Sequence, residues 1–283
     1  MSLNLITWNV QWCRGIDGSV DPARIARTAL DMAVFDVLCL QEVAVNFGSL
    51  AGSRGEDQMA ELAKALPGYV PIFGTATDLL NGICGRSLFG NAIFTRLPVL
   101  QVYRHALPWP PDPSVPSMQR MALEVVVDAA FGPLRVVSTH LEYYSSLQRM
   151  AQVEALRQLH EEACGHSRAP RPDTDEPGSP FAPAPRPASA MLCGDFNFEP
   201  RHSEHVRITA PFTNGEPEFR DAWELTHPGV AHPATAGIHD KTLPACCFDF
   251  VFVTQDLAPL VRRVEVNSAT EASDHQPVFV ELG

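Results

Sequence analysis

Short apolar segments of strand length recur along the whole chain, and they constrain its fold more than any other feature. Residues 3–8 alternate between apolar and polar side chains, whereas 37–40 and 190–193 are unbroken apolar runs, as expected for buried strands. Segments with helical periodicity are fewer, the clearest being residues 146–164. Because the strands outnumber the helices, we predict an α/β fold in which two mixed β-sheets pack face to face with helices on the outside, a four-layer α/β sandwich.

Local signals place the other elements. Asp21 suits an N-cap and Pro22 the first helical turn, so a helix begins there. A second helix is expected to end near Leu66, before Pro67-Gly68. Residues 74–89 are rich in glycine and lack periodicity, which predicts a surface loop. Further strands are expected at residues 69–73, 90–95, 99–103, 118–127, 134–139, 248–253, 261–267 and 278–282.

The length of the chain and one segment of low complexity decide its domain organisation. The chain has 283 residues, of which 45% are hydrophobic, enough for a large core. Residues 166–189 are rich in proline with scattered charge, a composition typical of mobile insertions. We therefore predict a single domain over residues 1–283 with a Pro-rich, flexible insertion at about 166–189.

Net charge and cysteine usage narrow the partners, the cross-links and the cellular compartment that we expect for the chain. The formal net charge of −12 gives no sign of a general field for nucleic acid, although a local basic groove would still permit binding. The seven cysteines include no Cys-x-x-Cys spacing, which argues against a disulfide framework and a structural zinc site. The sequence shows no signal peptide and no membrane-spanning stretch. We expect a monomeric, cytoplasmic protein without a transmembrane segment.

Polar side chains that suit metal and phosphate chemistry occur where the predicted strands begin or end. Asp195 and Asn197 follow the turn at Gly194, and in extended chain both would point the same way. The remaining members are Asn9, Glu42, His140, Asp249, Asp274 and His275. Hard oxygen ligands such as Glu42 and Asp274 favour Mg²⁺ or Mn²⁺ over Zn²⁺. An Asp that accepts a hydrogen bond from a His ring would fix the tautomer of that His.

Seven short blocks carry a resemblance to a known family. In order they are Thr7-Trp8-Asn9-Val10, Leu40-Gln41-Glu42-Val43, Gly90-Asn91-Ala92-Ile93, Ser138-Thr139-His140-Leu141, Gly194-Asp195-Phe196-Asn197, Phe248-Asp249-Phe250-Val251-Phe252 and Ser273-Asp274-His275-Gln276-Pro277-Val278. Each block is weak by itself, but together they run from residue 7 to residue 278. The sequence resembles the endonuclease/exonuclease/phosphatase family, the DNase I-like superfamily of metal-dependent phosphoesterases. The resemblance implies a DNase I-like four-layer sandwich.

The resemblance also implies a metal site. Glu42 matches the principal metal ligand of the family, with Asn9 beside it, and Asp274 matches a further carboxylate of that site. The implied cofactor is Mg²⁺ (or Mn²⁺), which would stabilise the leaving oxygen and polarise the phosphorus–oxygen bond.

The same resemblance assigns the catalytic groups. Asp195 matches the residue that orients or deprotonates the attacking water, and Asn197 the amide that holds this water or the transition-state oxygens. His275 matches the histidine that binds the scissile phosphate, and Asp249 its orienting acid. His140 matches a histidine of the sphingomyelinase-like and phosphatase branches, where abasic-site nucleases tend to have Tyr.

Two arginines match the family only weakly, and the sequence around the orienting acid departs from the family pattern. Arg120 and Arg149 match weaker family positions, and a structural ion pair explains each of them equally well. The family often has Arg-Ile-Asp-Tyr around the orienting acid, whereas Cys247-Phe248-Asp249-Phe250 stands here, so no arginine contact carries over.

Several other residues suggest sites without completing one. His202 and His205 are three residues apart and could contact a metal from one helix, but two ligands without a third are weak support. Tyr143 and Tyr144 suit stacking on a substrate or packing at a rim equally well.

The predicted function is hydrolysis of a phosphoester, most directly a phosphodiester, by water attack with a divalent metal. The substrate class stays open between nucleic acid and a lipid, inositol or nucleotide phosphoester, and so does the choice between diester and monoester. The alternative is a non-catalytic interaction module on the same fold, which the complete set of acids and histidines disfavours.

Overall fold

A computed structural model describes residues 2–170, 179–240 and 244–283 of the chain. In this part of the chain, twelve strands form two six-stranded sheets. The first sheet has the order β11-β12-β1-β2-β4-β3. Its strands are β1 (Leu3–Asn9), β2 (Val37–Val45), β3 (Val70–Asn81), β4 (Gly85–Thr95), β11 (Val261–Val266) and β12 (Val278–Leu282).

The second sheet has the order β5-β6-β7-β8-β10-β9. Its strands are β5 (Val99–Ala106), β6 (Met121–Ala129), β7 (Gly132–His140), β8 (Ala190–Asp195), β9 (Phe219–Asp221) and β10 (Asp249–Thr254). Each sheet contains one parallel pair, β1 with β2 and β7 with β8, among antiparallel neighbours. The predicted pair of mixed sheets is therefore confirmed.

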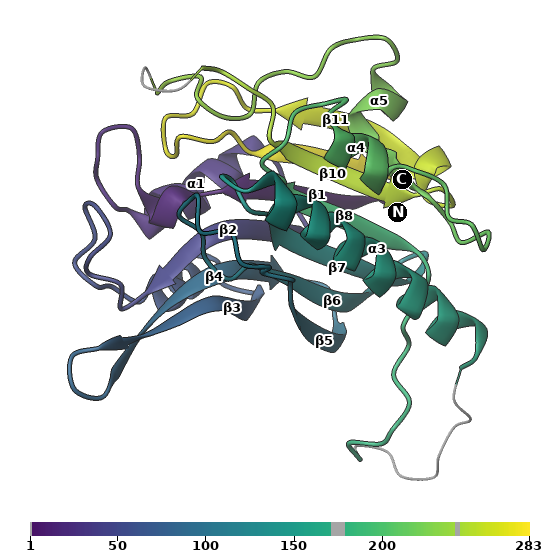
Figure 1. Cartoon of the computed structure of the whole chain (residues 1–283), viewed down its shortest axis with the longest axis horizontal. Helices are drawn as coiled ribbons and strands as arrows, with labels where there is room; N and C mark the ends of the chain where they lie inside the picture. Colours follow the sequence, from purple (N-terminus) through teal and green to yellow (C-terminus); the bar gives the residue numbers. More distant parts are fainter. Residues whose placement is uncertain (1, 171–178, 241–243) are drawn as a thin grey trace.

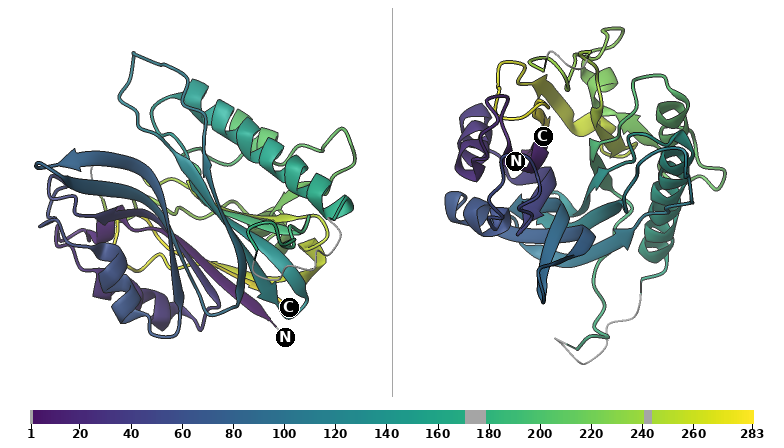
Figure 2. Two further views of the ribbon diagram at one scale, coloured as in Figure 1. Left: turned by 90° about the horizontal axis from the view of Figure 1, so that it is seen from below. Right: turned by 60° about the vertical axis from the view of Figure 1, so that its left-hand side comes forward.

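The helices cover the outer faces of the two sheets. They are α1 (Pro22–Met32), α2 (Gln58–Ala65), α3 (Ser146–Arg168), α4 (Ser203–Ile208) and α5 (Ala222–Thr226), with short 3₁₀ turns η1 (Gln11–Cys13) and η2 (Ala258–Leu260). Figure 1 and Figure 2 show α1 and α2 on one side of the paired sheets and α3 on the other. The four layers are thus helices, sheet, sheet and helices. Among the described helices, none combines the length and the apolar character needed to cross a membrane.

The core follows from the alternation of side chains along each strand. Leu5, Val125 and Val136 belong to the cluster between the two sheets. Residues on the opposite strand faces, such as Trp8, pack with Ile25 of α1 in a second cluster. A third cluster lies under α3, which begins at the predicted position. Alternating faces therefore build all three layers of apolar contact.

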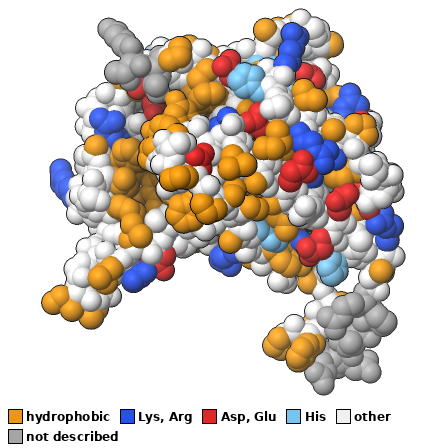
Figure 3. All heavy atoms as spheres, viewed as in Figure 1, with side chains coloured by type: hydrophobic (Ala, Val, Ile, Leu, Met, Phe, Trp, Pro, Cys, Tyr) orange, Lys and Arg blue, Asp and Glu red, His pale blue; other side chains and the backbone are white. Residues whose placement is uncertain are grey.

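The predicted loop at residues 74–89 is wrong. Strands β3 and β4 form a long hairpin whose pairing runs from Val70 and Thr95 to Asn81 and Gly85. The outer part of this hairpin is exposed, and hydrophobic side chains at its tip are visible in the space-filling view (Figure 3). Because most side chains on both faces of the outer hairpin are exposed, its sequence shows no polar alternation.

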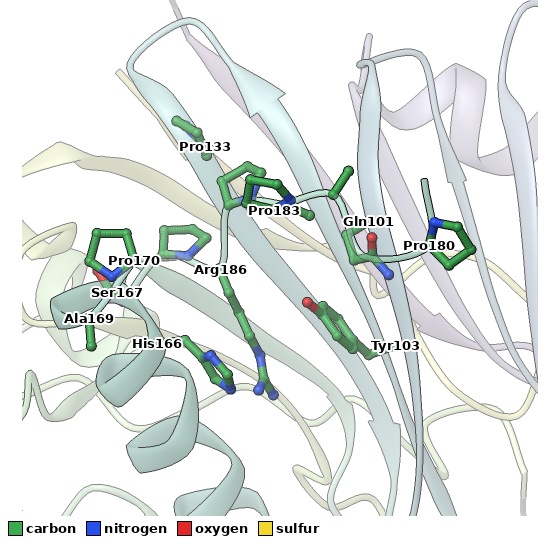
Figure 4. A pocket seen from close by; sticks show the side chains of 14 residues that line it. Gln101, Tyr103, Pro133, His166, Ser167, Ala169, Pro170, Pro180, Pro183 and Arg186 are labelled. Atoms are coloured by element: carbon green, nitrogen blue, oxygen red, sulfur yellow. The ribbon is translucent and has the colours of Figure 1, made fainter. Parts of the chain in front are cut away.

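The predicted insertion at 166–189 divides into three parts. Helix α3 runs to Arg168, four residues beyond the predicted end, so the insertion begins within it. Residues 171–178 lie outside the described residues. Pro180 and residues 182–187 line a cavity of about 520 Å³ against β5, and the guanidinium of Arg186 lies 4.7 Å from the centre of the Tyr103 ring (Figure 4). The flexibility of the insertion stays a prediction.

Candidate active site

The polar side chains predicted at the strand ends meet at one edge of the paired sheets. Asn9, His140 and Asp195 are the last residues of β1, β7 and β8. His140 and Asp195 are direct neighbours across the parallel pair, and Asp249 stands opposite Asp195 in the antiparallel pair of β8 and β10. Parallel strands end at the same edge of a sheet, which explains why residues far apart in sequence converge here.

A cavity of about 320 Å³ opens at this edge. Six of the eight predicted residues line it directly, and Asn9 and Asp249 contact members of the lining. The predicted residues in the lining are Glu42, His140, Asp195, Asn197, Asp274 and His275. The structure thus brings the whole predicted set together, while the chemical role of each member stays a prediction.

Asn9 connects the two sheets through its amide. Its Nδ2 donates to Glu42 Oε1 at 3.1 Å and to Asp195 Oδ2 at 2.9 Å, while its Oδ1 accepts the backbone N–H of Gln11 at 3.0 Å. Glu42 sits at the β-bulge of β2 with φ of 62°. In this arrangement Asn9 orients two carboxylates, and the role of its oxygen as a metal ligand stays a prediction.

Asp274 is held by donors that the sequence did not single out. Gln11 donates from Nε2 to Asp274 Oδ2 at 2.6 Å, and Ser273 Oγ donates to Asp274 Oδ1 at 3.2 Å. Gln11 lies two residues beyond the end of β1 and has φ of 45°. Its only sequence signal is that it is a polar residue just after a strand end.

The donor set fits a hard divalent cation. Burial raises the pKa of Glu42, and the charge of Asp274 raises it further. Burial also raises the pKa of Asp274. A cation would stabilise two half-buried carboxylates that repel each other, and oxygen ligands of this kind suit Mg²⁺ or Mn²⁺. The assignment of Glu42 and Asp274 as metal ligands stays a prediction, and in the described part of the chain Asp195, Asp249 and His275 also bring ligand atoms within 4.8 Å of one another.

His275 and Asp249 form a hydrogen-bonded pair. His275 Nδ1 lies 2.8 Å from Asp249 Oδ2, and His275 Nε2 lies 3.8 Å from Asp195 Oδ2. Burial would lower the pKa of His275, but the charges of Asp249 and Asp195 outweigh it and raise the pKa to about 10. The ring is therefore a cation at neutral pH, with Nδ1 fixed by Asp249.

In contrast to His275, which is held in its charged form, Asp195 and His140 have pKa values shifted toward their neutral forms. Burial raises the pKa of Asp195 to about 7 against the lowering effect of the His275 charge. Burial and the charge of Arg120 hold the pKa of His140 well below its usual value. His140 Nε2 lies 3.4 Å from Asp195 Oδ2. The site thus places a neutral imidazole and a weakly acidic carboxylic acid beside a cationic imidazole.

Asn197 differs from the extended geometry predicted for it. Its φ is 53°, and its backbone N–H donates to Asp195 Oδ1 at 3.0 Å, which makes an Asx turn. Its Nδ2 donates to the carbonyl of Leu141 at 2.9 Å. The expectation that strand alternation points both side chains the same way is therefore wrong, because the turn, not the strand, places Asn197 in the cavity lining.

Arg120 and Arg149 lie in different environments. Arg120 lines the cavity, is buried, and pairs through Nε with Glu142 Oε2 at 3.3 Å. Its Nη1 has no hydrogen-bond partner among the described residues. Arg149 instead pairs with Glu204 at 3.0 Å and binds the carbonyls of residues 142 and 143. Arg120 faces the site, whereas Arg149 braces the loop beside it.

The rim of the cavity is aromatic and comes from two loops. Tyr143 and Tyr144 are exposed and pack edge to face at 4.8 Å, and Phe248 lies 6.2 Å from Tyr143. Figure 3 shows hydrophobic side chains gathered over the loop before α3. The other wall includes Ala236, Gly237 and Cys246. The sequence does not predict these wall residues, since the only titratable group among the three is the half-buried thiol of Cys246.

Comparison with known proteins identifies relatives over almost the whole chain. The model of the Endonuclease/Exonuclease/phosphatase family matches residues 6–275. A search of the curated proteins finds no match. Among solved structures, the endonuclease/exonuclease/phosphatase from Beutenbergia cavernae DSM 12333 is 26% identical, with a TM-score of 0.69 over 99% of this chain and 71% of that chain.

Two more distant structures share the fold. The mannosyl-6-phosphatase of Bacteroides thetaiotaomicron VPI-5482 is 19% identical, with a TM-score of 0.68 over 99% of both chains. D. rerio TDP2, complexed with single-strand DNA product, is 19% identical, with a TM-score of 0.64 over 100% of this chain and 99% of that chain. At this identity the likeness concerns the fold.

Proposed function

The chain belongs to the endonuclease/exonuclease/phosphatase family, and from this premise we propose that it hydrolyses a phosphoester, most directly a phosphodiester, by attack of water in the presence of Mg²⁺ or Mn²⁺. The observation that carries the proposal is the pair of Asp195 and His275. Their reactive atoms lie 3.8 Å apart, and their pKa values are displaced to about 7 and about 10. Adjacent groups with such different protonation suit acid–base work on one bond.

Asp195, His275 and His140 each have a separate role in the proposed hydrolysis. Asp195, buried and ready to accept a proton near neutral pH, orients the water and takes its proton. Cationic His275, fixed by Asp249, donates hydrogen bonds to the phosphoryl oxygens. Neutral His140 adds a further donor to the charge that spreads over these oxygens in the transition state.

Three other residues complete the anion site. Arg120 lines the same cavity, and its guanidinium, whose Nη1 has no hydrogen-bond partner among the described residues, adds a fixed positive charge. A divalent cation held by Glu42 and Asp274 would supply electrophilic stabilisation of the phosphoryl group and leaving oxygen.

Hydrolysis of aryl phosphoesters tests the proposal. Bis(p-nitrophenyl) phosphate and p-nitrophenyl phosphate, each with Mg²⁺ or Mn²⁺, separate diesterase from monoesterase activity. We expect Asp195→Asn to lower kcat by about 10²–10⁴-fold, with Asp128→Asn, an exposed carboxylate on β6, as the matched control. Turnover that survives both complete chelation and Asp195→Asn contradicts the proposal.

The substrate class needs a separate screen. The solved neighbours include a mannosyl-6-phosphatase and a protein complexed with single-strand DNA product, so the fold by itself does not choose. Plasmid DNA, RNA, sphingomyelin, inositol phosphates and nucleotides should be compared with each metal. Because His140 stands where abasic-site nucleases tend to have Tyr, we expect abasic DNA to be a poor substrate, and efficient incision there would contradict this assignment.

A non-catalytic binding role is the second candidate. It shares the anion-binding residues but predicts phosphoester binding without turnover on the whole panel. The acid and base groups at the cavity favour the enzyme.

A further inference from the structure

A second cluster of metal-binding side chains lies outside the cavity that holds Asp195. We propose that it is a metal site for a borderline first-row ion such as Zn²⁺, with four protein ligands: His205, Asp221, His232 and Glu224. Among the described residues, one ligand atom from each of these four side chains lies within 4.8 Å of the others. The proposal is independent of the phosphoesterase assignment.

The donor atoms already have nearly the spacing that a small metal requires. His205 Nε2 and His232 Nε2 each lie 2.9 Å from the same atom, Asp221 Oδ2. In a tetrahedral zinc site with bonds of about 2.0–2.1 Å, neighbouring donor atoms are about 3.3 Å apart. Each of these two histidine–aspartate pairs is therefore within a few tenths of an ångström of the spacing that an ion requires, and the remaining donor atoms lie within 4.8 Å. Glu224 is exposed and can move to complete the shell.

The carboxylate is fixed before any ion binds. Asp221 Oδ1 accepts the backbone N–H of Trp223 at 2.9 Å, which leaves Oδ2 directed to the two histidines. Burial would raise the pKa of Asp221, but the hydrogen bonds from His205 and His232 lower it below its usual value. With Oδ1 held by the backbone, Oδ2 is the oxygen that Asp221 offers to an ion between the two histidines.

Aromatic rings enclose the cluster on its inner side. The ring of Phe250 lies 5.4 Å from His205 and 5.6 Å from His232, and Phe252 lies 5.7 Å from His205. Solvent reaches the cluster through a cavity of about 760 Å³ that Asp221, Glu224 and His232 line. The aromatic wall lowers the local dielectric constant, and the open cavity gives an ion access to the cluster.

The ligand chemistry separates this site from the one at Glu42. Two imidazoles with two carboxylates suit zinc and related ions, whereas oxygen ligands alone suit Mg²⁺ and Mn²⁺. The two sites lie on opposite faces of β10, since Asp249 faces His275 while the next residue, Phe250, packs against the second cluster. Each site can therefore be tested with the other disabled.

The second site would fasten a loop that forms one wall of the active-site cavity. His232 lies in the segment between α5 and β10, three residues before Thr235. The Oγ1 of Thr235 accepts the N–H groups of Phe248 and Asp249 at 3.0 Å each, and its carbonyl accepts the N–H of Gln276 at 2.7 Å. An ion that joins His232 to β9 and α4 would thus hold this loop beside His275.

Cobalt titration tests the proposal on the full chain. We use a background variant, Glu42→Gln with Asp274→Asn, which removes the hard carboxylates of the first site. We expect this protein, freed of metal, to bind one equivalent of Co²⁺ with the intense visible absorption of a tetrahedral site, and Zn²⁺ to displace it. The ion should also raise the Tm.

Three further substitutions in that background locate the ion. His232→Gln should abolish the tetrahedral spectrum, and His227→Gln should keep it, because His227 stacks on Trp223 at 3.8 Å outside the cluster. Glu224→Gln, at an exposed position, should fold normally and weaken Co²⁺ binding by about tenfold or more. Absence of stoichiometric binding in the background overturns the proposal. So does a spectrum unchanged in His232→Gln or, should that variant not fold, an affinity unchanged in Glu224→Gln.

Discussion

Acid sensitivity of the fold is predicted to depend strongly on one histidine under helix α3. His160 is buried; its Nδ1 lies 2.6 Å from Arg135 Nη2 and its Nε2 lies 2.8 Å from the carbonyl of Pro217. The arginine is a donor and the carbonyl an acceptor, so the ring is neutral with its proton on Nε2. Burial and the Arg135 charge lower the pKa of His160 from 6.5 to about 4.

The sign and size of the effect follow from this shift. Between pH 6.5 and 4 the unfolded chain binds the proton and the folded chain does not, so stability falls as the pH falls through this window. A difference of about 2.5 in pKa corresponds to about 3 kcal/mol of unfolding free energy. The loss is complete near pH 4 and absent above pH 7.

Urea unfolding followed by circular dichroism measures this loss. His160→Gln keeps a donor and an acceptor but no titrating ring, so its stability should decline by about 3 kcal/mol less than that of the wild type between pH 7 and pH 4. His166→Gln, at an exposed position of the same helix, keeps His160 and should show the wild-type decline. An equal decline in the His160→Gln variant and the wild type refutes the reasoning.

Two other substitutions test the anion site and the turn that supports it. Arg120→Lys removes an unpartnered guanidinium nitrogen from a residue of the cavity lining, so kcat/KM for an aryl phosphodiester should fall by about 10–100-fold, the loss expected for one charged hydrogen bond. Arg96→Lys, at an exposed arginine paired with buried Asp36 outside the cavity lining, should leave this kcat/KM unchanged. Equal values for both variants would contradict the assignment. Gly194 has φ of +136°, and a Cβ there would lie 1.9 Å from a carbonyl oxygen of β7. In urea unfolding, Gly194→Ala should lower the unfolding free energy by about 3 kcal/mol or more. Gly68→Ala, where φ is +87° and the space is open, should lower it by about 1 kcal/mol. Similar losses at both positions would show that backbone conformation, not crowding, sets the penalty.

Much of the candidate site was predictable because strand ends are local features with a geometric consequence. Asn9, His140 and Asp195 each stand at the end of a predicted strand, and parallel pairing carries them to one edge. The sheets were predictable for the same reason, since a buried strand records its burial in its own residues. The order of the strands in each sheet cannot be predicted from the residues of a single strand, because it depends on pairing between segments far apart in the chain.

The features that the sequence did not predict depend on conformation or distance. Asn197 enters the cavity lining through a left-handed turn, which the preceding strand does not indicate. Most side chains of the outer hairpin of β3 and β4 are exposed, so its sequence carries no alternating pattern. His205 showed only one possible companion, His202, in the chain, whereas its partners Asp221 and His232 come from later segments.

The candidate site spans the seam between the two sheets. Glu42 and His275 belong to the first sheet and the segment leading into it, while Asp195 and Asp249 belong to the second. The seam is crossed by Asn9 to Asp195 and by His275 to Asp249. A third polar contact lies deeper, where buried Gln41 Nε2 donates to Ser138 Oγ at 3.0 Å. An apolar interface tolerates small sliding, whereas directional hydrogen bonds in a dry interior do not. The polar contacts therefore set the register of one sheet on the other, and with it the spacing of the groups that meet the substrate.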